Sequence, residues 1–154
     1  MVINPLFGQD YLRIIKSGVN IRFGPSSSSR IITQAKNGNI FELTEEKGDW
    51  YGIIMFSGEY RYIPKSMCEK IKYNLSLPQD IQLRKKVFNS ILTVEDKAQV
   101  DEDAKFPPSD INKNIEYNRI LNDKYKLDII NKFNLQPPIY SKLISEGAKN
   151  RWDL

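Results

Sequence analysis

The spacing of hydrophobic residues changes once along the chain, near residue 74. Before that point, apolar residues occur in short runs separated by Gly, Ser and Asn, which is typical of strands joined by turns. Residues 19–23 (VNIRF) alternate strictly between apolar and polar, as expected for a strand with one buried and one solvated face. After residue 74, the apolar positions repeat with helical spacing. The chain is therefore predicted to contain a β-rich part followed by an α-helical part.

The β-rich part contains six predicted strands, at residues 11–15, 19–23, 30–36, 40–44, 50–56 and 60–63. The turns between them are marked by small and polar residues: an exposed Gly-Pro-Ser-rich loop at 24–29 and a tight hairpin at 37–39 (NGN). Pro64 ends the last strand, because proline cannot donate to a β-ladder. Several short strands without a helical window predict a small, strongly twisted β-barrel.

Residues 19–26 (VNIRFGPS) resemble the opening signature of bacterial Src-homology-3-like (SH3b-type) domains, which reads approximately V-N-V-R-x-G-P-S. The resemblance continues through residues 36–39, 48–51 (GDWY) and 58–63 (GEYRYI), and it covers about residues 10–72. It implies an SH3-like barrel that binds ligands. Two positions depart from the pattern: Arg61 stands where the family's second glycine usually lies, and Tyr62 stands where its tryptophan lies.

The helical part is predicted to contain about three helices, which makes the fold class α+β. We expect a barrel domain at residues 1–73, a linker at 74–79 and a helical region at 80–154. Pro78 and Asp80 mark the start of the first helix. The acid-rich segment 95–110 is predicted to be a loop or frayed turn, and Ser109 or Asp110 to cap the second helix.

The end of the second helix and the whole of the last one are marked by residues with special backbone preferences. Asn134 is predicted to end the second helix in a left-handed conformation. Pro137-Pro138 is expected to open the last helix and Gly147 to close it.

Composition argues against catalysis. The chain has no histidine and one cysteine, Cys68, which excludes His-dependent nucleophile systems, intramolecular disulfides and thiolate zinc clusters. No pair of carboxylates stands at a recognisable catalytic spacing. We therefore predict a protein that is not an enzyme and that has no metal or cofactor.

The net charge of +4 is spread along the chain, with 10 basic and 7 acidic residues in 1–73 and 13 and 12 in 74–154. This distribution lacks the clustered basic stripe that nucleic-acid binding usually requires. Residues 1–7 (MVINPLF) do not read as a signal peptide, and no apolar stretch is long enough to cross a bilayer. The expected location is the cytoplasm, or the cell envelope or periplasm if a leader has been removed.

Aromatic residues in the last two strands form the predicted ligand site: Trp50, Tyr51, Tyr60 and Tyr62. Flat rings contact extended chains at little entropic cost. The alternative is that Trp50 packs under the barrel and the tyrosines fit a half-buried sheet. Arg22 and Arg61 are expected to flank the same surface and to accept a carboxylate, with surface ion pairing as the alternative.

The favoured function is binding or scaffolding. The barrel would hold a peptide, a protein or a peptidoglycan fragment, and the helical tail would dock or mediate interaction. The alternative is a regulatory nucleic-acid-binding protein that acts through a helix-turn-helix-like segment at 127–147. The last helix of that segment has basic residues at Lys142, Lys149 and Arg151 but also Glu146, so nucleic acid is the less favoured partner.

Overall fold

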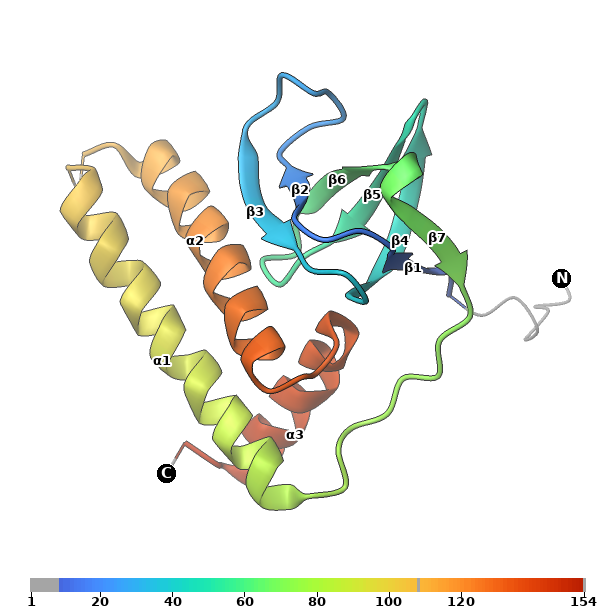
Figure 1. Cartoon of the computed structure of the whole chain (residues 1–154). Coiled ribbons are helices and arrows are strands. Elements are labelled where there is room, and N and C mark those ends of the chain that lie inside the picture. Colours follow the sequence, from blue (N-terminus) through green and yellow to red (C-terminus); the bar gives the residue numbers. More distant parts are fainter. Residues whose placement is uncertain (1–8, 108, 154) are drawn as a thin grey trace, which may run out of the picture. The chain divides into compact units, whose positions relative to one another are not determined.

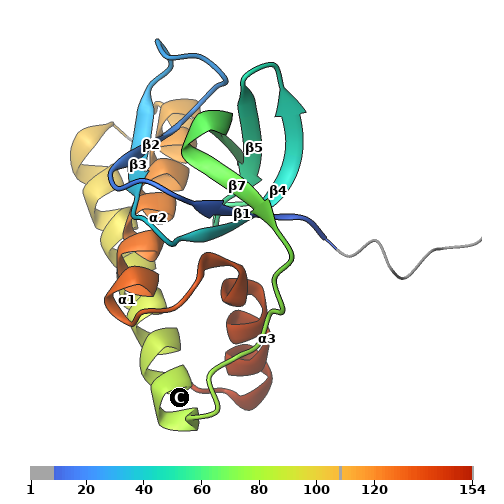
Figure 2. The same cartoon turned by 45° about the vertical axis from the view of Figure 1, so that its right-hand side comes forward.

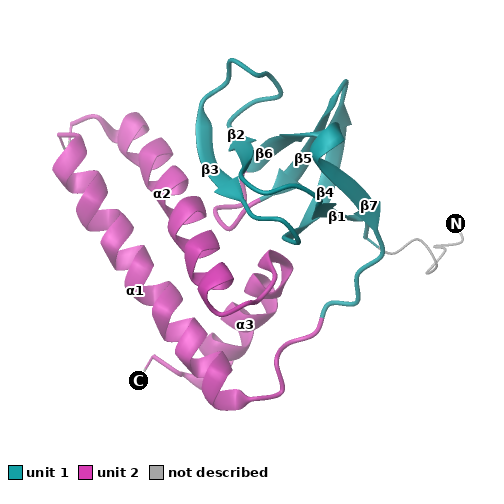
Figure 3. Cartoon of the chain, in the orientation of Figure 1, with its two compact units in different colours: residues 1–54, 60–75 teal, residues 55–59, 76–154 magenta. Residues whose placement is uncertain are grey.

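The computed structural model describes residues 9–107 and 109–153 of the chain. Its internal contacts divide the chain into two units, which Figure 3 colours separately. The first unit comprises residues 1–54 and 60–75, and the second comprises residues 55–59 and 76–154. Segment 55–59, the turn between two strands of the first unit, thus belongs to the helical unit. Within the described residues, no helix is both long and apolar enough to span a membrane.

The first unit is an antiparallel seven-stranded sheet that curls strongly on itself (Figures 1 and 2). The strand order is β3-β2-β6-β5-β4-β1-β7. This strongly bent antiparallel sheet is the small β-barrel that the sequence predicted. The elements are β1 (Tyr11–Ile14), β2 (Val19–Arg22), β3 (Ile31–Ala35), β4 (Ile40–Lys47), β5 (Trp50–Ile54), β6 (Tyr60–Pro64), the 3₁₀ turn η1 (Lys65–Met67) and β7 (Cys68–Ile71).

The longest strand, β4, connects the two parts of the curled sheet. Its first residues pair with β1 and its later ones with β5, and the register shifts between Leu43 and Glu45. Glu45 stands opposite Gly52, where an added Cβ would lie 2.6 Å from the Cγ of Glu45 and 3.0 Å from the Oγ1 of Thr44. A side chain at residue 52 would therefore collide with this irregularity, which explains the glycine within a central strand.

The hairpin prediction at residues 37–39 is wrong, although a turn is present. Gly38 adopts a φ of +89°, and the Oδ1 of Asn39 accepts a 2.9 Å hydrogen bond from the backbone N–H of Lys36. However, β3 pairs with β2, whereas β4 pairs with β1 and β5. The turn therefore sends the chain across to another part of the sheet, because the twist of a small barrel separates strands that follow each other in sequence.

The barrel core consists of apolar residues that alternate inward along the strands. The fully buried ones are Leu12, Ile14, Ile21, Phe41, Ile53 and Ile63. The alternation predicted for residues 19–23 holds for Val19 and Ile21, which are buried, but Phe23 is 42% exposed. Phe23 lies beyond the end of β2, so the pleat no longer directs it inward.

The second unit contains three α-helices, as predicted: α1 (Ile81–Lys105), α2 (Ile111–Lys132) and α3 (Tyr140–Asn150), the last preceded by the 3₁₀ turn η2 (Pro137–Ile139). Helices α1 and α2 lie side by side as an antiparallel pair (Figures 1 and 2). The Oδ1 of Asp80 accepts from the N–H groups of Gln82 and Leu83, at 2.8 and 3.2 Å, and Asp110 caps α2. Asn134 has a φ of +54° just beyond α2, as predicted.

The predicted loop at 95–110 is instead mostly the last part of α1, which continues to Lys105. Neither glycine nor proline occurs between residues 81 and 106, and Lys97 pairs with Asp101 one turn later. The helix ends where Pro107 holds Phe106 in an extended conformation, with φ −125° and ψ 143°. Of its acidic residues, Asp96 and Asp103 are exposed, whereas Glu102 is buried.

The sequence predicted that Gly147 closes the last helix, but the structure shows that it does not. Helix α3 continues to Asn150, and Arg151 is the left-handed residue that ends it, with a φ of +52°. Gly147 is glycine because of close packing: an added Cβ would lie 2.3 Å from two ring carbons of Phe88. Trp152 is partly buried and packs edge-to-face on Phe88, with ring centroids 5.9 Å apart.

Residues 1–73 expressed alone are expected to give a β-type circular dichroism spectrum. The strands pair with one another, and the apolar core described above lies entirely within this segment. A random-coil spectrum would show that the barrel needs the helical region to fold, and the proposed domain boundary near residue 74 would then fail.

Candidate ligand site on the barrel

A cavity of about 390 Å³ opens in the first unit. Its wall combines the turn between β1 and β2, β2 itself, the loop after β2, the first residue of β5 and the region where β6 passes into η1. The lining residues are Lys16, Ser17, Gly18, Val19, Asn20, Arg22, Ser27, Trp50, Pro64 and Met67.

Trp50 forms part of the cavity wall and is only partly buried. It is the first residue of β5, and its cross-strand partners are Lys47 on β4 and Pro64 on β6. Directly opposed residues share a face of the sheet, so the indole and the ring of Pro64 lie on the same face. Trp50 is thus partly covered by the barrel and partly open to the cavity.

Arg22 lines the cavity and also holds the loop beside it. Its Nη1 donates to the carbonyl oxygen of Ser29 at 2.7 Å. The same serine accepts, through its Oγ, a 2.7 Å hydrogen bond from the N–H of Gly24. The serine-rich loop is thus a hydrogen-bonded turn that brings Ser27 to the cavity wall.

The charge at this wall is positive. Lys16 and Arg22 line it, and no acidic residue is among its lining residues in the described parts of the chain. A guanidinium carries five N–H donors in a planar fork, and Ser29 uses one of those of Arg22. The wall therefore offers cationic donors next to the flat, partly buried surface of Trp50.

Tyr62 lies next to the cavity but is not one of its lining residues. It pairs with Arg22 across β2 and β6 and is buried. Its hydroxyl donates to the Oε1 of Glu45, and its cross-strand neighbour on β5 is Gly52, which has no side chain to block this path. Burial, and then the hydrogen bond to Glu45, raises the pKa of Tyr62, so the phenol remains a neutral donor.

The other three predicted residues, Tyr51, Tyr60 and Arg61, do not line the cavity. Tyr51 follows Trp50 and faces the other side of the strand, with the ammonium groups of Lys65 and Lys70 5.1 and 5.6 Å from its ring centroid. Tyr60 is 49% exposed and is not among the cavity residues.

Arg61 does not flank the same surface as Arg22, contrary to the expectation. It is 2% exposed, and its guanidinium carbon lies 4.9 Å from the centroid of the Phe23 ring. Since Tyr62 is the residue opposite Arg22, the preceding residue points to the other face of the sheet.

Most of the lining was missed by sequence reasoning. Residues 16–18 carry only a generic turn signal. Gly18 is the turn residue, with a φ of +66°, but nothing in the sequence indicates that this turn approaches Trp50. Pro64 could have been predicted as a lining residue. A hairpin centred on residues 57–58 places it opposite Trp50 on the neighbouring strand. Met67 belongs to a 3₁₀ turn, for which the sequence carries no periodic signal.

Cys68 is buried and does not line the cavity. Burial raises the pKa of the Cys68 thiol to about 11, so this cysteine stays protonated near neutral pH and is a poor nucleophile. Among the described residues, no group of three or more His, Cys, Asp or Glu side chains could hold a metal ion.

The first unit is thus a small, strongly bent antiparallel barrel whose cavity is lined by an indole and two cationic side chains. Residues 17–67 match the family model described as the bacterial SH3 domain. The N-terminal half of the chain therefore contains a bacterial SH3 domain, as the resemblance had implied. A search of curated proteins found no match to the chain. The domain is a binding module of a generally non-catalytic type.

Proposed function

We propose that the barrel binds an extended peptide with a free carboxylate, either a protein segment or the peptide part of a peptidoglycan fragment, in the cavity beside Trp50. The observation that carries this proposal is the combination of a partly buried indole with Lys16 and Arg22 in a wall without acidic lining residues. We propose that the chain acts by binding alone and that its helical unit docks or mediates interaction.

The apolar and the cationic groups of the cavity would contribute to binding in different ways. The indole of Trp50 and the apolar atoms of Val19, Pro64 and Met67 provide contact area, which supplies most of the affinity. The cationic side chains provide orientation, because a guanidinium fork matches a carboxylate in shape and charge. Of the residues predicted from sequence, we assign ligand contact to Trp50 and Arg22.

The compartment follows from the ligand under this proposal. A protein peptide fits a cytoplasmic protein, whereas a peptidoglycan fragment fits a protein of the cell envelope. Binding of one probe and not the other would therefore also report on location.

The nucleic-acid alternative has less support. In α3, Glu146 forms a bidentate ion pair with Arg84 of α1. The Nε and Nη2 of Arg84 donate to the two carboxylate oxygens at 2.9 and 2.8 Å. Helix α3 itself contains two basic residues, Lys142 and Lys149, which is fewer than the basic stripe that phosphate binding usually requires. Retardation of duplex DNA by the full chain that weakens with salt would support the alternative.

The proposal predicts that Trp50→Ala weakens binding of a carboxylate-bearing peptide at least about tenfold, the effect expected for an aromatic anchor. Suitable probes are soluble muropeptides and a short alanine peptide, the latter compared with its C-terminally amidated form by isothermal titration calorimetry. Amidation should weaken binding because it removes the charge that Lys16 and Arg22 would meet.

The matched control is Tyr60→Ala, which removes an exposed ring outside the cavity. It should leave the affinity unchanged. Equal affinity of wild type and Trp50→Ala, or equal losses in Trp50→Ala and Tyr60→Ala, would refute the site.

A further inference from the structure

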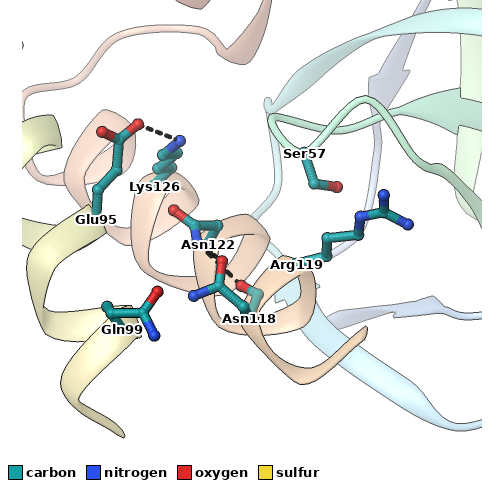
Figure 4. A pocket seen from close by; sticks show the side chains of 7 residues that line it. All are labelled: Ser57, Glu95, Gln99, Asn118, Arg119, Asn122 and Lys126. Atoms are coloured by element: carbon teal, nitrogen blue, oxygen red, sulfur yellow. Dashed lines mark hydrogen bonds and ion pairs between the residues drawn. The ribbon is translucent and has the colours of Figure 1, made fainter. Parts of the chain in front are cut away.

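The second unit contains a cavity of its own, also of about 390 Å³. Figure 4 shows the seven side chains that line it, which come from α1, from α2 and from Ser57 in the turn at 55–59. All seven are polar or charged. A wall of this kind is unsuited to an apolar ligand, whose binding sites are lined mainly by hydrophobic and aromatic side chains.

The most unusual member of the wall is Lys126, whose side chain is only 6% exposed. Lysine is almost never buried to this degree without partners. Its ammonium lies 2.7 Å from the Oε1 of Glu95 and donates to the hydroxyl of Tyr140 at 2.8 Å. An ammonium has three N–H donors, so these two partners leave one donor for a further acceptor.

The charges at this cavity are matched. Lys126 pairs with Glu95, and Arg119 forms a 2.7 Å ion pair with Glu59 in the same turn as Ser57. Each charged residue that lines the cavity therefore has a partner of opposite charge. A neutral ligand fits the cavity better than an anion or a cation, because a charged ligand would compete with an existing pair.

The neutral amides supply the remaining hydrogen-bonding groups. The Nδ2 of Asn122 donates to the carbonyl oxygen and to the Oδ1 of Asn118, at 3.0 and 2.8 Å. The Oδ1 of Asn122 is buried and has no hydrogen-bond donor, which is an unfavourable arrangement for a carboxamide. Because this oxygen is covered, a ligand would reach it only if the carboxamide rotated and gave up its bonds to Asn118. Gln99 donates to Asp103 at 3.0 Å, which leaves its own amide oxygen for a ligand.

We propose that this cavity binds a neutral, polyhydroxylated small molecule of about the size of a monosaccharide. Each hydroxyl both donates and accepts, so one group can accept from the spare N–H of Lys126 while it donates to an amide oxygen. Neither an apolar molecule nor a simple anion satisfies both requirements. This site is separate from the barrel cavity, and the inference does not depend on the function proposed for the barrel.

The direct test is a titration of the full-length ¹⁵N-labelled chain with glucose, N-acetylglucosamine and myo-inositol. At least one of these probes should produce saturable shifts of the side-chain amide signals of Gln99, Asn118 and Asn122, with a Kd on the order of 1 mM, as expected for a small polar ligand. Gln99→Ala changes an exposed side chain and should weaken binding several-fold. Gln82→Ala, an exposed amide on α1 outside the cavity, should have no effect.

Two results would overturn the proposal. One is the absence of saturable shifts with all three probes, and the other is an equal response to acetate or phosphate, which would identify an anion site. The Tm of Asn122→Leu, a substitution of similar volume, separates a ligand role from a structural one. An unchanged or higher Tm together with lost sugar binding supports the proposal, whereas a lower Tm with sugar binding retained contradicts it.

Discussion

Replacing Gly147 by alanine is expected to lower the free energy of unfolding by about 2–3 kcal/mol, the upper part of the range for overpacking. Alanine is favoured over glycine within a helix by up to about 1 kcal/mol, so propensity alone predicts the opposite sign. Packing dominates because the new Cβ would lie 2.3 Å from the Cδ2 and Cε2 of Phe88. That ring is 4% exposed and is in contact with Trp152, so it has little room to move.

Thermal or urea unfolding of the full chain measures this effect, and a double-mutant cycle identifies its cause. Ser145→Ala, on the exposed side of the same helix, should be neutral or slightly stabilising. In a Phe88→Ala background, Gly147→Ala should cost much less, because the collision is removed. If Gly147→Ala stabilises the wild-type chain, the close packing of α3 on α1 is wrong.

Replacing Asp123 by alanine is expected to cost about 2–4 kcal/mol of unfolding free energy, because it removes a buried acceptor of two hydrogen bonds. Asp123 on α2 is fully buried. Its Oδ1 accepts from the backbone N–H of Ser57 at 2.8 Å and its Oδ2 from the Ser57 hydroxyl at 2.9 Å. Without the carboxylate, the N–H of Ser57 loses its acceptor.

Two variants separate the contributions at this contact, measured by the same unfolding experiments. Asp123→Asn keeps one acceptor and should lose about half as much stability as Asp123→Ala. Ser57→Ala removes the hydroxyl's bond to Asp123 and the 3.3 Å bond that it accepts from the N–H of Glu59, and it should cost about 1–2 kcal/mol. Equal stability of wild type and Asp123→Ala would show that the turn at 55–59 is not held by α2.

The sequence predicted the elements better than their partners. Strand positions followed from alternation and turn residues, and the caps at Asp80 and Asp110 followed from short side-chain acceptors before apolar periodicity. The segment 95–110 was misassigned because its acidic residues were given more weight than the lack of any helix-breaking residue before Pro107. Gly147 was misassigned because a close approach to a residue nearly 60 positions earlier leaves no local signal.

The lining of the barrel cavity was predicted only in part. Trp50 and Arg22 could be proposed from the family-like pattern, and both line the cavity. Arg61 could not be placed without the register, since one position along β6 separates it from the residue opposite Arg22. Lys16, Ser27 and Met67 come from turns and loops, and their approach to Trp50 is set by how the sheet curls.

The two tryptophans allow the proposed ligand site to be tested in one spectrum, because Trp50 borders the barrel cavity while Trp152 packs on Phe88 in the other unit. The measurement is a titration of the full-length ¹⁵N-labelled chain with a carboxylate-bearing peptide or muropeptide, with the two indole N–H signals assigned by a Trp152→Phe variant. We expect the Trp50 signal to shift saturably while the Trp152 signal stays in place, and the amidated peptide to shift the Trp50 signal only at markedly higher concentration. A Trp50 signal that does not respond, or that responds equally to the amidated peptide, would contradict the proposed site.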